Sequence, residues 1–129
     1  MTDAFFPYAF DRRFKPFLQA FGVRPDRDGV RLMDNGDLVA SFGRLRLTTP
    51  LSNVEGAHIT ERYAWFKAVG ARLSFVDDGL TFGTNTERGV CIHFGERVAA
   101  VIGPRRHSAL TVTVEDCEGL VSAIEQLPR

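Results

Sequence analysis

Cys91 and His93 are separated by one residue in a stretch that alternates apolar and polar side chains. Alternate residues of a β-strand project from the same face, so we expect the thiol and the imidazole side by side, opposite Val90, Ile92 and Phe94. Such a pair can supply two ligands to zinc, but a protein zinc site needs three or four. The other soft candidate ligands are His58, His107 and Cys117. None of these three residues lies within a short sequence spacing of Cys91 and His93. We therefore predict that Cys91 and His93 form a polar strand face, and we predict no metal or other cofactor.

Asn53, Glu55 and His58 form a second polar group, which we place in a loop before a predicted helix. A glutamate and a histidine can act as base and acid in a reaction. No GxSxG motif, HExxH motif or glycine-rich phosphate loop accompanies them. We therefore predict a structural loop in a protein that is not an enzyme. The alternative is a small enzyme with an unfamiliar site, in which these three side chains and His93 converge in one concave pocket.

Arg105, Arg106 and His107 are three adjacent residues that can carry positive charge, and they precede the last predicted strand. Guanidinium and imidazolium groups in one loop can hold a phosphate or a carboxylate. Such a run is more often a solvated turn. We keep the three residues as candidates for ligand binding.

Aromatic residues make up 11% of the chain, and eleven of them are phenylalanines. Most are expected in the core, but some could line an apolar pocket or a partner surface. Tyr63 and Trp65 are candidates within a predicted helix. Phe5, Phe6 and Tyr8 precede the predicted strands, so we expect them to be available to a partner, including another copy of the chain.

Alternating patterns and turn residues predict six to eight short antiparallel strands between residues 28 and 115. Asn35-Gly36 is a strong hairpin signal, because both central residues of a type I′ turn need positive φ; it joins predicted strands at 30–33 and 38–42. A second tight turn is predicted at 86–89. Further strands are predicted at 44–48, 73–75, 80–82, 90–94, 98–102 and 110–114.

Three helices are predicted around this strand-rich body. The first lies in an aromatic segment spanning residues 1–22, with Pro16 in its first turn and Gly22 as its stop. The second spans 60–69 with Thr60 as its cap, and the third spans 116–127 with Asp116 as its cap. Residues 1–129 are a normal length for one domain, and we expect a single one.

The expected fold is α+β and β-rich. Consecutive antiparallel strands need closure to hide their edges, so we predict a strongly bent antiparallel sheet or a small barrel, capped by the C-terminal helix.

The closing segment, Arg105 to Asp116 followed by Leu120 to Leu127, resembles the end of bacterial pleckstrin-homology-like domains. That resemblance implies a strand-rich half-barrel closed by a helix that an acidic residue introduces. The runs Thr49–Val54 and Gly79–Asn85 are similar to uncharacterised actinobacterial proteins. Neither resemblance supplies catalytic residues.

Sixteen basic and sixteen acidic residues give a formal net charge of zero, which argues against nucleic acid as a partner. No window approaches the length of a membrane-spanning segment. Two cysteines are too few for a disulfide framework. Cysteines that stay reduced are typical of a cytoplasmic protein. We therefore predict a binding or interaction module for a peptide, a partner protein or a small apolar ligand; a homo-oligomeric structural protein is a further alternative.

Overall fold

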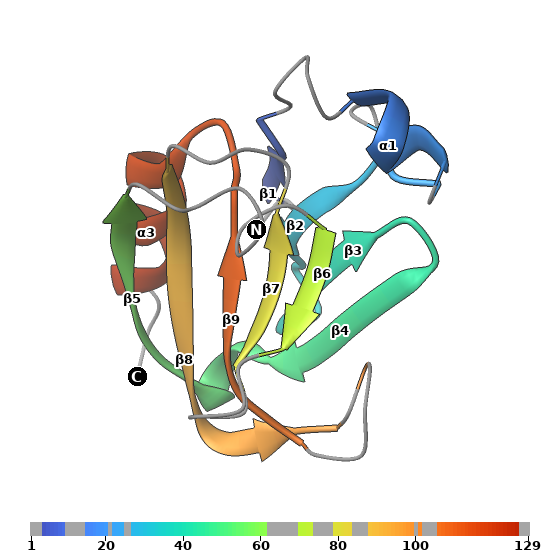
Figure 1. Ribbon diagram of the computed structural model, residues 1–129. Coiled ribbons are helices and arrows are strands. Elements are labelled where there is room, and N and C mark those ends of the chain that lie inside the picture. The colour runs from blue at the N-terminus through green and yellow to red at the C-terminus, as the bar shows by residue number, and fades with distance from the viewer. Residues whose placement is uncertain are drawn as a thin grey trace.

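Two β-sheets and a C-terminal helix make up most of the computed structural model (Figure 1). The structure describes residues 4–9, 15–20, 22–24, 27–61, 70–73, 79–83, 88–99, 101 and 106–126. The first sheet has the order β1 (Ala4–Pro7), β2 (Gly29–Leu32), β3 (Asp37–Phe42), β4 (Leu45–Pro50). The second has the order β5 (Val54–Glu61), β8 (Arg88–Val98), β9 (His107–Val112), β7 (Leu80–Gly83), β6 (Gly70–Leu73). The described helices are α1 (Lys15–Ala20), the 3-10 turn η1 (Leu51–Asn53) and α3 (Cys117–Glu125).

The predicted β-rich α+β fold is confirmed, but the closed barrel is not, since the strands form two separate sheets. The second sheet is also not purely antiparallel. Strand β7 runs parallel to β9, with Leu80 opposite Leu110, so the chain crosses over between them. Parallel pairing needs such a long connection, which the local turn signals did not indicate.

Several locally encoded elements agree with prediction. The predicted hairpin joins β2 to β3, but it is not the two-residue type I′ turn: the Gly36 N–H donates to the Met33 carbonyl at 3.1 Å and the Met33 N–H donates to the Asp37 carbonyl at 2.8 Å. The loop therefore has three residues, and Gly36, at a φ of 95°, takes the left-handed position that closes it. Strand β4 alternates as expected, with Leu47 buried and Arg46 exposed.

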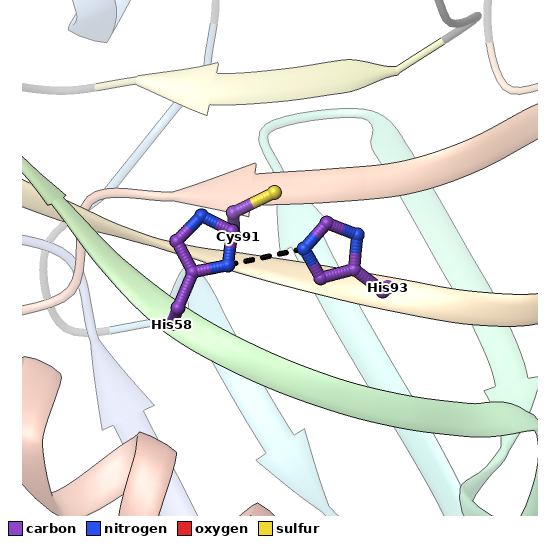
Figure 2. A group of neighbouring side chains, drawn as sticks. All are labelled: His58, Cys91 and His93. Carbon is purple, nitrogen blue, oxygen red and sulfur yellow. Dashed lines mark hydrogen bonds between the residues drawn. The ribbon is translucent and has the colours of Figure 1, made fainter.

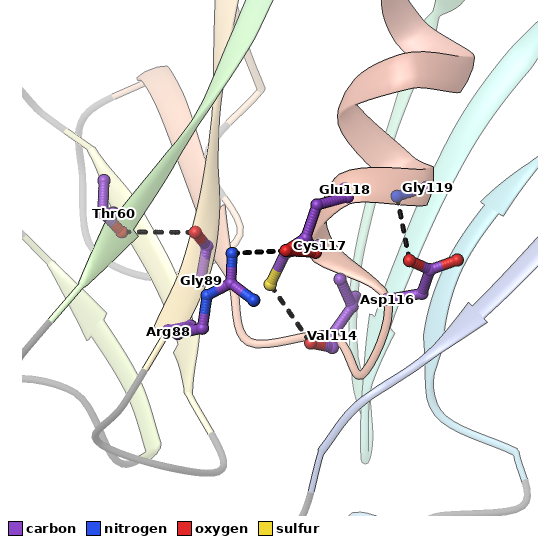
Figure 3. Close-up of polar contacts among 8 residues, drawn as sticks. All are labelled: Thr60, Arg88, Gly89, Val114, Asp116, Cys117, Glu118 and Gly119. Carbon is purple, nitrogen blue, oxygen red and sulfur yellow. Dashed lines mark hydrogen bonds and ion pairs between the residues drawn. The ribbon is translucent and has the colours of Figure 1, made fainter.

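Helix α1 also ends as predicted, with Gly22 at a φ of 83°, and α3 begins after Asp116, as Figure 3 shows. The Asp116 carboxylate accepts a hydrogen bond of 2.9 Å from the Gly119 N–H. An ion pair of 2.6 Å between Arg88 and Glu118 connects α3 to β8. The hydrogen bond from Arg88 lowers the pKa of the Glu118 carboxyl.

Parts of three predicted elements differ from the described structure. Thr60 does not cap a helix: it lies in β5 opposite Gly89, whose carbonyl accepts a 3.5 Å hydrogen bond from the threonine hydroxyl. Residues 62–69 lie outside the described residues. The strand predicted at 98–102 is wrong in its described residues, because β8 runs from Arg88 to Val98 and neither residue 99 nor residue 101 is in a strand. The turn predicted at 86–89 overlaps β8 at residues 88–89, and residues 86–87 lie outside the described residues. A long partner strand, β5, supplies the pairing that no local pattern reveals.

The core lies between the two sheets and under α3. Phe42 of β3 stacks on Phe82 of β7, with ring centroids 5.1 Å apart, and the Tyr8 ring meets Phe42 edge-on at 5.7 Å. From the helix, Leu120 and Ile124 are fully buried. Aromatic pairs of this geometry add about 0.5–1.5 kcal/mol beyond the area they bury, so they join the sheets as one unit.

Residues 7–9 connect the two ends of the described chain. Tyr8 forms a β-bridge with Val114. The Ala9 N–H donates to the Thr113 carbonyl at 2.8 Å, and the Glu115 N–H donates to the Pro7 carbonyl at 2.9 Å. The segment after β1 is thereby fixed against the segment after β9.

Tyr8 is 1% exposed, and its hydroxyl donates to the Ser41 carbonyl at 2.7 Å. Burial, followed by the negative charge of Asp28, raises the pKa of this phenol well above its ordinary value of 10.0. The folded protein therefore keeps this proton at a pH where the unfolded chain has lost it. The contribution of Tyr8 to stability is complete below the pKa that its phenol has in the unfolded chain. It is lost progressively as the pH rises above that value.

We expect the free energy of unfolding to fall above pH 10 by up to about 1.4 kcal/mol per pH unit from this group. Tyr8→Phe should flatten that alkaline slope, while costing about 1 kcal/mol at neutral pH through the lost hydrogen bond. Urea denaturation from about pH 8 to pH 11 measures both effects. An unchanged alkaline slope in Tyr8→Phe would show that other groups control it.

No helix in the described part of the chain is long and apolar enough to cross a bilayer.

Candidate metal-binding site

The paired strands β5 and β8 bring His58, Cys91 and His93 together, as Figure 2 shows. His58 lies directly opposite Cys91 in the antiparallel register, and His93 lies opposite Gly56. Directly opposed residues of an antiparallel pair project to the same face, so all three side chains share one face. The predicted placement of Cys91 and His93 on one face is confirmed, whereas the loop predicted for His58 is wrong.

The two imidazoles are in direct contact. His58 Nδ1 and His93 Nε2 lie 3.1 Å apart at hydrogen-bond distance, and the rings stack with centroids 5.0 Å apart and planes inclined by 20°. Together with the Cys91 sulfur, one donor atom from each residue falls within 4.8 Å of the others. Both histidines are exposed and Cys91 is half-buried.

These distances suit a tetrahedral metal ion. Two nitrogens bound to one zinc ion at about 2.0–2.1 Å lie roughly 3.3 Å apart, close to the 3.1 Å between His58 and His93. A zinc-bound sulfur lies roughly 3.6 Å from each nitrogen, and the Cys91 sulfur lies within 4.8 Å of both nitrogens, so it would have to approach each of them by about 1.2 Å at most. The imidazole–imidazole hydrogen bond holds one proton between the nitrogens, and a metal ion would replace it.

The neighbouring strand β9 adds no strong ligand on this face. Its residues opposite His93 and Cys91 are Ala109 and Thr111. Within the described ranges, no second group of three histidine, cysteine or carboxylate ligands is present. The site therefore offers two imidazole nitrogens and one thiolate.

Cys117 and His107 are built into the core. Cys117 is 1% exposed, and its thiol donates to the Val114 carbonyl at 3.4 Å (Figure 3). Burial is the largest cause that raises the pKa of this thiol, which disfavours the thiolate that binds metal. His107 is fully buried, and its Nε2 accepts a hydrogen bond of 3.0 Å from the Val101 N–H.

The four residues of the enzyme hypothesis do not converge in one pocket. His58 and His93 belong to the site above, whereas Asn53 lies in an open groove of about 560 Å³ beside β4 and β8. The groove is lined by Thr48, Thr49, Pro50, Ser52, Asn53, Gly95, Glu96, Arg97, Val98 and Ala99. Glu55 is exposed and lies near Gly95, but it does not line this groove.

The Asn53 side chain serves the backbone. Its amide oxygen accepts from the Glu96 N–H at 2.7 Å, and its amide nitrogen donates to the Glu96 carbonyl at 2.9 Å. The same nitrogen also donates to the Thr49 hydroxyl at 3.0 Å. The Asn53 amide thus pairs with both backbone groups of Glu96, as a neighbouring strand would. This structural role explains its position without a catalytic role.

The other sequence candidates lie apart from one another. Arg106 is exposed and His107 is buried, so these neighbours do not present charge to one ligand; Arg105 lies outside the described residues. Tyr63 and Trp65 also lie outside them.

At the N-terminal segment, Phe5 is 38% exposed and Tyr8 is in the core, while Phe6 is partly buried against it. Because β1 pairs with β2, these residues do not precede the fold but belong to it. The Arg31 guanidinium covers the Phe5 ring at 4.1 Å from its centroid.

No pattern used for the prediction placed His58 beside Cys91 and His93. The signal that could have found it is the alternation Gly56-Ala57-His58-Ile59-Thr60, which is typical of a strand with two β-branched residues. Comparison with family models, with curated proteins and with solved structures finds no match for this chain, so the case for its function depends on this geometry.

Proposed function

We propose that the protein is a metal-binding module that holds one zinc-like transition-metal ion at His58, Cys91 and His93. The observation that carries the proposal is that three donor atoms from two paired strands lie within 4.8 Å of one another. Imidazole and thiolate together favour zinc and copper over magnesium or calcium, which prefer oxygen ligands.

The backbone supports the ligands in this arrangement. His58 and Cys91 are opposed in a continuous ladder that runs from Gly56–His93 to Glu61–Arg88. The reverse faces of both strands pack into the core through Ile59, Val90 and Ile92. A one-residue slip would expose that apolar face, so the strand pairing that buries the core also fixes the distance between the ligands.

The proposal requires a compartment in which Cys91 stays reduced, and the cytoplasm predicted from the cysteine count is such a compartment. It is a specific form of the binding module predicted from the sequence. The resemblance of the last strand and helix to pleckstrin-homology-like domains fits a binding role as well, although the ligands proposed here lie outside that segment.

Calorimetric titration of chelator-treated protein with zinc under reducing conditions tests the proposal. We expect one ion per chain at pH 7.5. Metal ligands must be deprotonated to bind, so the affinity should fall as the pH is lowered and protons should be released on binding. A stoichiometry near zero, or binding that persists unchanged when both His58 and His93 are replaced by alanine, would refute it.

A further inference from the structure

Strand β5 carries an extra residue beside the candidate metal site. Val54 lies opposite Phe94 of β8, but the next paired residue of β5 is Gly56, two positions further on. Gly56 lies opposite His93, which is only one position before Phe94. Glu55 is therefore the additional residue of a β-bulge. Such bulges redirect a side chain and are frequent beside functional sites, so this one brings a carboxylate to the strand position next to a proposed ligand.

The Glu55 side chain lies against Gly95 of β8. A side chain at Gly95 would begin 3.5 Å from Glu55 Cγ and 3.7 Å from the carboxyl carbon Cδ. Gly95 follows His93 by two positions, so these two residues project from the same strand face, about 6.6 Å apart along the strand. The exposed Glu55 carboxylate therefore lies on the His93 face of β8, next to the position of that imidazole.

The His93 ring requires a hydrogen-bond acceptor when it binds a metal ion. Figure 2 shows Nε2 of His93 facing His58, with the other ring nitrogen, Nδ1, on the side of the ring away from His58. A metal ion bound to Nε2 leaves the imidazole proton on Nδ1, because a neutral imidazole carries one N–H. Metal-bound histidines almost always donate that N–H to a carboxylate, a backbone carbonyl or water.

We propose that Glu55 is this acceptor and acts as a positioning residue, which holds the His93 ring in the orientation that the metal ion requires. The proposal rests on the proposed metal site. A hydrogen bond from Nδ1–H to a carboxylate fixes which nitrogen carries the proton and makes Nε2 a stronger donor to the metal. The bulge therefore has a purpose in the site, because it supplies the carboxylate without interrupting the pairing of His58 with Cys91.

The zinc affinity of two glutamate variants of the full chain tests this role. Glu55→Gln should lower the affinity about 10-fold or more, as expected for the loss of a carboxylate that supports a metal ligand. Glu96→Gln is the matched control, because it removes the same charge from a second exposed position near Gly95. It should have little effect at about 0.15 M salt, where exposed charges are screened. Since both glutamates are exposed, both variants should fold.

NMR of the nitrogen-15-labelled imidazole rings separates positioning from a general effect of charge. In the zinc-loaded protein, His93 should carry its proton on Nδ1, and that proton should resonate downfield because a carboxylate accepts it. Glu55→Gln replaces the charged acceptor by an amide oxygen, a weaker one, so the His93 N–H signal should move upfield. Glu96→Gln should leave the signal in place.

The outcomes separate this inference from the proposed function. If the unmodified protein binds no zinc, both fail. If zinc binds but Glu55→Gln and Glu96→Gln have equal affinity, or if the His93 N–H signal stays in place in Glu55→Gln, only the role of Glu55 is refuted. An unmoved signal is the result expected if Glu55 instead pairs with Arg97, which is exposed two positions beyond Gly95.

Discussion

Replacement of Cys91 by serine should lower the affinity for zinc by more than about 100-fold. Changes to residues that merely support metal ligands already cost about 10–100-fold, and Cys91 supplies the only sulfur in the group of three. His93→Ala should have an effect of the same order, because it removes one of the two nitrogens that lie 3.1 Å apart. Competition against a chromophoric zinc chelator measures both affinities.

Cys117→Ser is the matched control for this substitution. The serine hydroxyl can still donate to the Val114 carbonyl, as the thiol does at 3.4 Å. This variant should keep the zinc affinity of the unmodified protein. Because both histidines are exposed, the Cys91 and His93 variants should also keep their melting temperature in the absence of metal. Equal zinc affinity in Cys91→Ser and Cys117→Ser would contradict the assigned ligand set.

The second large effect is expected for Phe42, whose ring packs against the second sheet. It is 4% exposed and touches both Phe82 and Tyr8. Phe42→Ala removes the apolar contact and leaves a cavity, which in protein cores costs about 3–5 kcal/mol. Urea denaturation followed by circular dichroism measures the loss.

Phe5→Ala makes the same chemical change at a position that is 38% exposed, so it should cost much less than Phe42→Ala. If Phe42→Ala proves too unstable to purify, Phe42→Leu keeps part of the contact and should show an intermediate loss. Similar losses in Phe5→Ala and Phe42→Ala would mean that the aromatic contact between the sheets does not dominate stability.

Elements that depend on interactions between residues close in sequence could be predicted, whereas those that depend on pairing between distant strands could not. The turn at Asn35-Gly36 and the stop at Gly22 depend on backbone conformations that single residues favour, and both were predicted. Asp116 and the apolar spacing after it were likewise sufficient for α3. These signals involve only neighbouring residues, so they can be recognised without knowledge of the tertiary structure.

The candidate site could be predicted only in part, because its ligands come from two strands. Cys91 and His93 are two residues apart, and alternation alone places them on one face. His58 is 35 residues from His93, and only the register between β5 and β8 connects them. The sequence around Thr60 is ambiguous for a related reason. A threonine is both a good helix cap and a good strand residue, and its pairing with Gly89 decides between the two.

The hydrogen bonds of residues 7–9 with residues 113–115 also bear on how the protein folds. The partners are more than a hundred positions apart, so loop closure between them carries a large entropic cost. On the ribosome, Tyr8 emerges long before Val114 and cannot complete this bridge until translation has passed the last strand. Until then the Pro7 carbonyl and the Ala9 N–H lack their backbone partners on Glu115 and Thr113, so we expect this contact to form only after the last strand has left the ribosome.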